Sequence, residues 1–284
     1  MQIEPRDRPP RKPSAAKLPV LIILLAAIAV AVWFVSNKEP GPEPAADIEE
    51  PAVQPFPSAV ESAPDIPRME PEPEQELSEE EPQPSLPPLE TSDEYTRETL
   101  APLSGSDDYA QWLGSDNLLQ KAVAFVDGLS RGNVLRKGLP VAPPEGSFKV
   151  VREEDRIWMD ESNYARYDSL TATFTSISPQ ALAKAFHQLR PLLEMAYEEL
   201  GHPGDRVDNS IIAAIDQVLA TPDVTMPLAL KSESVAYKFA DPALESLPAA
   251  QKQLLRMGPD NAARIKAHLR EIRDALLAEA GQQG

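Results

Sequence analysis

The sequence contains three histidines and no cysteine, so metal binding or acid–base catalysis would depend on histidine and carboxylate side chains. On a predicted helix, His187 lies seven residues before Glu194 with Pro191 between them, which is poor spacing for two metal ligands. His202 lies in a Gly-His-Pro-Gly turn, and neither it nor His268 belongs to an H-E-x-x-H motif. We therefore expect no metal site and no cofactor, with the histidines at surface or capping positions.

Motifs for nucleophilic and phosphate chemistry are missing from the sequence. It has no G-x-S-x-G elbow for a serine nucleophile and no glycine-rich phosphate loop. The run Glu153-Glu154-Asp155 could supply paired carboxylates for glycoside hydrolysis, but a solvated hairpin turn accounts for it better. Other carboxylates leave a hydrolase open as an alternative: Asp160, Glu161 and Asp168. We assign no catalytic residue and favour a protein that is not an enzyme.

Basic side chains gather on the last predicted helix, residues 259–280. From Lys252 to Arg273 the sequence has six basic and two acidic residues. At about 100° per residue, Lys266, Arg270 and Arg273 lie on a narrow band beside an apolar stripe. This basic band is the candidate partner-binding site, for an acidic protein face, a peptidoglycan carboxylate or a lipid phosphate. The alternatives are that its side chains pair with acidic residues of the same domain or contact the acidic linker.

The basic band belongs to a predicted domain, residues 93–284, which we expect to be mainly α-helical with a small β-hairpin element (α+β). Apolar residues recur there at three- and four-residue steps, and capping residues mark the helix ends. Ser178-Pro179 starts one helix, and Gly201 ends it. One predicted helix begins at 115–116. The others span 164–174, 178–200, 208–219, 242–257 and 259–280, with Gly258 between the last two. Alternating residues predict a hairpin over 147–160, and 228–239 is ambiguous, with a short strand pair as one interpretation.

Residues 36–92 are predicted to form a disordered, acidic and proline-rich linker. From residue 39 to residue 92 the sequence has fifteen acidic side chains, fourteen prolines and one basic residue, Arg68. Like charges repel and proline restricts φ, so this composition does not build a core. A solvated tether is the simpler interpretation, and a docking site for a partner is the alternative. Phe56, Ile66 and Leu86 are isolated apolar residues that could act as anchors.

The run from Leu18 to Val35 is apolar and uncharged, and as a helix its length suits a thin bilayer. Basic residues near a membrane span stay on the cytoplasmic side. We therefore predict a cytoplasmic basic tail at residues 1–17, a transmembrane helix at residues 18–35 and a domain outside the cytoplasm. A signal peptide cleaved after Ala31 is the alternative, but the apolar run continues past that position. The basic residues before the run are Arg6, Arg8, Arg11, Lys12 and Lys17.

Charge and cysteine content narrow the compartment and the partners. The net charge is −18, and most of it is concentrated in the linker. Phosphate contacts need clustered positive charge, so this composition argues against nucleic-acid binding as the main role. The absence of cysteine fits an oxidising compartment, where free thiols are a liability.

Several long strings of the domain match a known family. They are Tyr164-Ala165-Arg166-Tyr167-Asp168, Leu189-Arg190-Pro191-Leu192-Leu193, the stretch from Tyr237 to Glu245 and the stretch from Gln251 to Asn261. On these strings the chain resembles a proteobacterial membrane-anchored family of unknown function, number three thousand and fourteen in its series, over about residues 88–280. The resemblance implies an anchor in the inner membrane of a Gram-negative envelope and a domain in the periplasm. It transfers no catalytic residue.

These observations favour a single-pass, inner-membrane-anchored protein that presents a helical interaction domain to a periplasmic protein or an anionic envelope component. A structural spacer or assembly factor of the envelope is the first alternative. An envelope hydrolase that uses carboxylates is the second. An interaction module should have a specific partner, whereas a hydrolase should have a cleft that contains a perturbed carboxylate.

Overall fold

The computed structural model describes residues 60, 63–68, 86–134, 146–233 and 236–278. They form mostly α-helix with a small antiparallel sheet, which confirms the α+β class predicted from the sequence. The predicted membrane span, residues 18–35, lies outside the described residues. Within the part of the chain that is described, no helix has both the length and the apolar character to cross a membrane.

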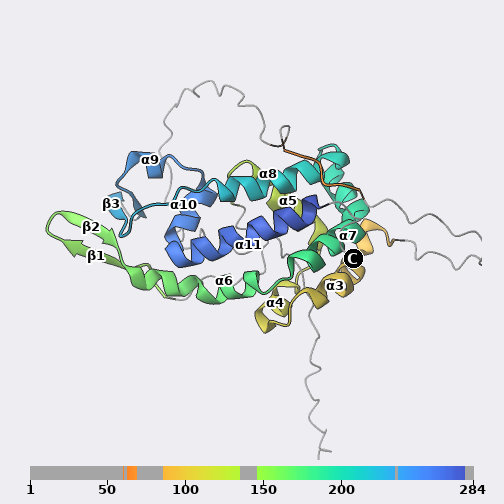
Figure 1. Cartoon of the computed structure of the whole chain (residues 1–284), viewed down its shortest axis with the longest axis horizontal. Coiled ribbons are helices and arrows are strands. Elements are labelled where there is room, and N and C mark those ends of the chain that lie inside the picture. The colour runs from red at the N-terminus through yellow and green to blue at the C-terminus, as the bar shows by residue number, and fades with distance from the viewer. Residues whose placement is uncertain (1–59, 61–62, 69–85, 135–145, 234–235, 279–284) are drawn as a thin grey trace, which may run out of the picture.

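Four long helices pack together and build the main core (Figure 1). They are α5 (Leu118–Ser130), α7 (Pro179–Glu199), α8 (Val207–Leu219) and α11 (Pro259–Leu277). Every residue of α8 from Val207 to Ile215 is buried, because this helix packs against α5, α7 and α11. The structure also describes the shorter helices α3 (Asp93–Leu100), α4 (Asp107–Trp112), α6 (Asp168–Thr175), α9 (Pro242–Glu245) and α10 (Ala249–Arg256), with 3₁₀ helices η2 (Leu89–Thr91), η3 (Ala101–Leu103), η4 (Glu161–Tyr167) and η5 (Gly204–Arg206).

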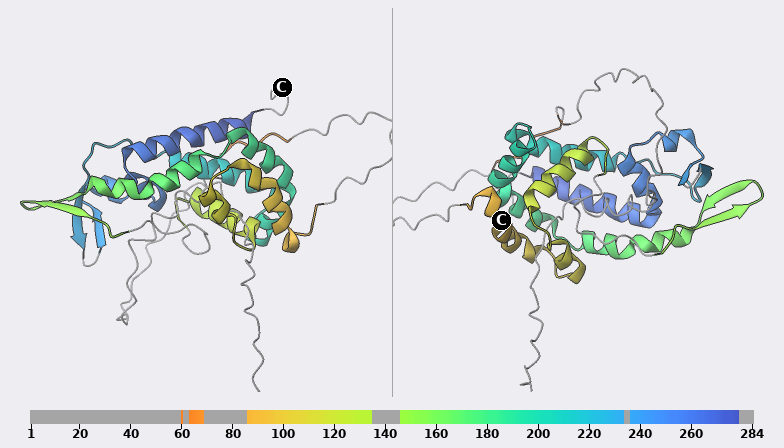
Figure 2. Two further views of the ribbon diagram at one scale, coloured as in Figure 1. Left: turned by 90° about the horizontal axis from the view of Figure 1, so that it is seen from below. Right: turned by 180° about the vertical axis from the view of Figure 1, so that it is seen from behind.

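A four-stranded antiparallel sheet covers one end of the helical body. Its order is β1 (Val150–Glu153), β2 (Arg156–Met159), β3 (Ala229–Glu233) and β4 (Ala236–Phe239). The β1–β2 hairpin extends away from the helices, at the end opposite α3 in every view (Figures 1 and 2). The predicted hairpin and strand pair are both present, and β2 joins them by pairing with β3, so the sheet is larger than the predicted hairpin element.

The strongest local signals define α7 and the start of α11 as predicted. The Ser178 hydroxyl accepts a hydrogen bond from the Ala181 amide, and the helix continues through Pro191 to Glu199. Gly258 has a φ of 87°, and a Cβ there would lie 2.4 Å from the Tyr164 ring. Only glycine fits both the conformation and the space at this junction between α10 and α11.

Two predicted helices have different boundaries in the structure. The helix predicted over 242–257 is divided into α9 and α10, and Pro248 directly precedes α10. Proline donates no amide hydrogen bond and disfavours a helical residue before it, which explains the break. The helix predicted over 164–174 becomes the 3₁₀ helix η4 followed by α6.

The predicted starts of two further helices shift in sequence. α5 begins at Leu118 and not at 115–116, because the Asp93 carboxylate accepts hydrogen bonds from the Asn117 and Leu118 amides. This carboxylate caps the helix from another element. α8 begins at Val207, so Asp208 and Asn209 lie in its first turn and do not cap it.

The body begins earlier than the domain boundary predicted at residue 93. Leu89 in η2 is 4% exposed and belongs to the main apolar cluster. Ser92 is buried as well, and its hydroxyl donates to the Leu89 carbonyl. Parts of the segment predicted as a disordered linker therefore have ordered contacts with the domain.

Candidate functional site

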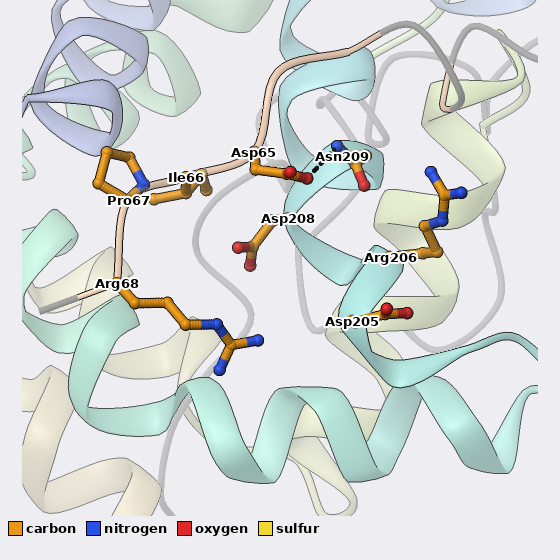
Figure 3. A pocket seen from close by; sticks show the side chains of 8 residues that line it. All are labelled: Asp65, Ile66, Pro67, Arg68, Asp205, Arg206, Asp208 and Asn209. Carbon is orange, nitrogen blue, oxygen red and sulfur yellow. Dashed lines mark hydrogen bonds between the residues drawn. The ribbon is translucent and has the colours of Figure 1, made fainter.

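A short segment of the predicted linker lies against the helical body. Residues 63–68, which we call the strap, have the sequence Ala-Pro-Asp-Ile-Pro-Arg and run across the first turn of α8 towards α7 (Figures 1 and 3). Ile66 is 2% exposed and belongs to the same apolar cluster as the long helices. The strap therefore contributes a core side chain although η2, the first element of the body, begins only at Leu89.

Asn209 binds the first half of the strap. Its side-chain amide donates to the Ala63 carbonyl at 2.8 Å and to the Asp65 carboxylate at 2.7 Å. Asn209 is itself 3% exposed, so its position is fixed by the packing of α8. One buried side chain thus recognises both a main-chain carbonyl and an acidic side chain of the strap.

Arg190 on α7 binds the second half of the strap. Its Nη2 donates to the Ile66 carbonyl at 2.7 Å, and its Nη1 donates to the Pro67 carbonyl at 3.2 Å. Its guanidinium group lies over the Phe186 ring, with the guanidinium carbon 5.0 Å from the ring centroid. The guanidinium fork therefore holds two successive main-chain carbonyls in a fixed orientation.

The same guanidinium forms a buried ion pair with Asp208. Arg190 Nε donates to Asp208 Oδ1 at 3.3 Å, and Nη2 donates to Oδ2. Both side chains are 6% exposed. Burial raises the pKa of the Asp208 carboxyl above its usual value, and the positive charge of Arg190 opposes the rise. Asp208 thus fixes the side chain that holds the strap.

An exposed ion pair completes the contacts at the end of the strap. Arg68 Nη2 lies 2.7 Å from Glu194 Oε1 on α7, and the Arg68 side chain is 63% exposed. Beside it is an open hollow of about 530 Å³, into which Arg68 and Asp208 both point (Figure 3). The hollow is lined by the strap, by the first turn of α8 and by Asp205 and Arg206 of η5.

Close packing of η5 on α7 positions these side chains. A Cβ at Gly204 would lie 2.8 Å from the Glu198 carboxylate and 2.9 Å from the Glu194 carbonyl. Glycine at this position lets the start of α8 approach the second half of α7. Arg190 and Glu194 from α7 and Asn209 from α8 thus bind the strap, with Asp208 paired to Arg190, and we call the strap-binding site formed by these four side chains the α7–α8 groove.

The three side chains of the predicted basic band lie on α11 in different environments. Lys266 is 8% exposed, and its Nζ lies 2.9 Å from both the Thr221 carbonyl and the Asp223 carboxylate. Arg273 Nε donates to Asp216 of α8 at 2.8 Å. Arg270 is exposed. Two of the three therefore have acidic partners inside the domain, as in the first alternative, and a partner-binding role for the band stays a prediction.

The histidines and the carboxylate run are separated from one another. His187 adjoins Arg190 and the strap, His202 stacks on Tyr197, and His268 packs its ring edge-to-face with Phe174. Glu153 ends β1, and Glu154 and Asp155 form the turn to β2, with all three side chains exposed. No group of three or more histidine or carboxylate side chains within the described ranges has a geometry that could hold a metal ion.

The strap is the part of the candidate site that sequence reasoning did not place. Ile66 stood out as an isolated apolar residue, and Arg68 as the one basic residue of an acidic stretch. Those two signals mark the strap, but they do not reveal that it binds its own domain. The helical side of the contact gave no signal of binding: Arg190 stood only in a string that matches the family, and Asp208 and Asn209 are typical helix-start residues.

Comparison with known proteins gives one match. The family model described as "Protein of unknown function (DUF3014)" matches residues 118–273. This range includes α7 and α8 with all four groove side chains, and it excludes the strap. No match was found among curated proteins or among solved structures.

Proposed function

We propose that this chain, which belongs to the DUF3014 family of proteins of unknown function, is an interaction module that binds an extended peptide segment in its α7–α8 groove. One observation carries the proposal: buried side chains of the domain hold main-chain carbonyls of a segment more than one hundred residues away in the sequence. Side-chain donors that hydrogen-bond to backbone carbonyls bind a peptide by its extended main chain. A peptide side chain that is buried between these contacts adds specificity.

The strap contacts suggest a modest affinity for such a segment. Burial of one aliphatic side chain contributes about 1.5–3 kcal/mol. Each hydrogen bond contributes about 0.5–1.5 kcal/mol net, before the cost of ordering the peptide. We expect a short peptide to bind with a Kd of about 10–100 µM, which suits an interaction that tethering strengthens.

We further propose that residues 18–35 hold the module in the bacterial inner membrane, with the domain in the periplasm. The support comes from the sequence: an apolar run of sufficient length, basic residues before it and an acidic stretch after it. A tethered module meets membrane-bound partners at a raised local concentration, so weak peptide binding is sufficient.

Peptide binding is tested with a synthetic peptide of residues 60–69 that carries a fluorophore. The receptor is the full-length chain in detergent micelles with Ile66→Asp, which removes the apolar anchor of the strap and leaves every groove side chain in place. We expect anisotropy to give a Kd of about 10–100 µM. The matched control is the same peptide with aspartate in place of its isoleucine. Equal binding of both peptides, or binding of neither to a receptor with unchanged circular dichroism, would contradict the proposal.

Topology is tested by labelling single cysteines, because the natural chain has none. Gln2→Cys and Gln282→Cys place one thiol near each end. In spheroplasts, a membrane-impermeant maleimide should label position 282 and should label position 2 only after lysis. Labelling of both positions in intact spheroplasts would contradict the proposed membrane arrangement.

A further inference from the structure

We infer that the strap is a resident competitor in the α7–α8 groove, and that a partner protein displaces it with a segment of the same order: an acidic residue, an aliphatic residue, proline and a basic residue. This inference rests on the proposed function and names its partner and its regulation. The order follows from the strap itself, whose Asp65, Ile66 and Arg68 meet three different environments in the groove.

Each position of the strap has its own receptor group. Asn209 donates to the acidic side chain, and the apolar cluster of the helices receives the aliphatic one. Glu194 lies at the other end and binds the basic side chain at 2.7 Å. A segment in the reverse order would bring an acidic side chain to Glu194, so the groove fixes the direction as well as the composition of the peptide.

Release of the strap leaves the domain largely complete. Among the described residues, the main apolar cluster lies between Leu89 and Leu277, except for Ala63 and Ile66. Arg190 keeps its ion pair with Asp208 when the strap leaves, so no buried charge loses its partner. Water can reach the freed donors through the open hollow beside them. Exchange of one segment for another therefore costs far less than unfolding of the body.

The strap does not use all the hydrogen-bonding capacity of its site. Asn209 Oδ1 is buried and has no hydrogen-bond partner among the described residues. His187 Nδ1, near Arg190 on α7, is also buried and has no hydrogen-bond partner among the described residues. Such atoms are costly when unpaired, so a segment that offers a donor to either one gains an interaction that the strap lacks. A partner can therefore bind more tightly than the resident segment.

Covalent connection sets the strength of the competition. Roughly 20 residues join the strap to η2, and a connection of this size gives an effective concentration in the millimolar range. With a peptide Kd of about 10–100 µM, the native chain should bind an added peptide about 10- to 100-fold more weakly than a chain with a disabled strap.

The experiment compares full-length chains with the same labelled peptide of residues 60–69. We expect the native chain to bind it about 10- to 100-fold more weakly than the Ile66→Asp chain. Arg68→Glu, an exposed change that sets like charges opposite Glu194, should give an intermediate affinity. Equal affinity of the native and Ile66→Asp chains would overturn resident competition and leave the proposed function standing. Binding to neither chain would overturn both.

The order of the partner segment is tested with two altered peptides and the Ile66→Asp chain. A peptide with glutamate in place of its arginine should bind several-fold more weakly, because it meets Glu194. A peptide with the residues of positions 65–68 in reverse order should lose most of its affinity. Undiminished binding of the reversed peptide would overturn the stated order of the partner segment.

Discussion

The α7–α8 groove and the basic band of α11 both place cationic side chains beside carboxylates, but the N–H groups of these cations bind different kinds of partner. In the groove, Arg190 divides its N–H groups between Asp208 and two carbonyls of the strap. On α11, Lys266 and Arg273 direct theirs to Asp223, Thr221 and Asp216 within the domain. The first arrangement holds a segment that comes before the helical body in the sequence. The second joins elements of that body.

This difference teaches that local charge density is a weak guide to a binding site. The basic band has a high density of positive charge in the sequence, and two of its three cations pair with acidic residues of the same domain. Arg190 stands in an ordinary amphipathic helix, and its contacts are set by the buried Asp208 and by the strap. What distinguishes a binding cation is a donor that reaches a separable segment. The predictions below test this distinction, beginning with the largest expected effect.

Removal of the groove cation should cost the most stability. In Arg190→Met the buried Asp208 carboxylate loses its ion pair, and we expect the free energy of unfolding to fall by about 3–5 kcal/mol. Chemical denaturation of the purified chain measures this loss. The double variant Arg190→Met with Asp208→Leu removes the orphaned charge and should recover much of it. A loss below about 1 kcal/mol in the single variant would equate the Arg190–Asp208 pair with the more exposed Arg273–Asp216 pair of α11.

Truncation of Ile66 in the strap should lower the free energy of unfolding by a smaller amount, and this amount has an upper limit. Ile66→Ala weakens docking, and the cost cannot exceed the free energy with which the strap is held, so we expect about 1–2 kcal/mol rather than the larger loss of an ordinary core residue. Trypsin should cleave after Arg68 about tenfold faster than in the native chain. An unfolding midpoint that falls as for a core truncation, with unchanged cleavage at Arg68, would make the strap an integral core element.

Acidification compares the two regions through one histidine in each: His187, which is partly buried, and His268, which is buried. Burial lowers the pKa of His187 below its usual value, and the nearby positive charge of Arg190 lowers it further. Burial likewise lowers the pKa of His268 on α11, against the opposing charge of Glu271. The unfolded chain therefore takes up protons first as the pH falls through the usual histidine range, and stability decreases. Melting curves from pH 7.5 to 5 should show a shallower decrease for His268→Gln, and an unchanged slope would contradict this account.

Loss of one cation of the basic band should cost little. Arg273 and Asp216 form a pair whose side chains are 30% and 45% exposed, and such pairs contribute less than about 1 kcal/mol. Arg273→Met keeps the aliphatic stem and removes the charge. Denaturation at low and at high salt should give values for this variant that differ less than those of the native chain, since salt screens the native pair.

The smallest effect on stability is expected for the exposed cation. Arg270→Glu should leave the free energy of unfolding unchanged within about 0.5 kcal/mol. This variant also gives the cleanest test of the basic band as a partner site, because Lys266 is too buried for a charge reversal to leave the fold intact. Photo-crosslinking in cells from the exposed position 267, which leaves Arg270 in place, would reveal a partner, and capture that survives when Arg270→Glu is added would exclude a role for this charge.

Local sequence signals predicted the helices and the strands better than the site. The Ser178 cap, the Gly258 junction and the alternation of the hairpin are short-range effects, and each is present in the fold. Tertiary contacts override such signals elsewhere, as where Asp93 sets the start of α5 from another helix.

Short-range sequence signals do not predict the α7–α8 groove either, because its contacts join residues that are far apart in the sequence. Asp208 and Asn209 have the side chains of typical helix caps, and the fold turns both towards partners on other elements. The contacts between Arg190 and the strap span more than 120 positions of sequence. Proline and acidic residues around Ile66 are typical of a solvated linker, and nothing in that composition specifies the cavity that receives one isoleucine.

The docked strap also determines how far the domain can stand from a membrane. With residues 18–35 in the bilayer as proposed, residues 36–62 alone separate the membrane from the groove, and a fully extended chain of that length reaches at most about 95 Å. With the strap released, residues 36–88 become available, and the limit rises to about 185 Å. Exchange of the strap for a partner segment would thus lengthen the free chain between the membrane and the domain when the partner binds. The bound domain could then remain with a partner that lies farther from the membrane.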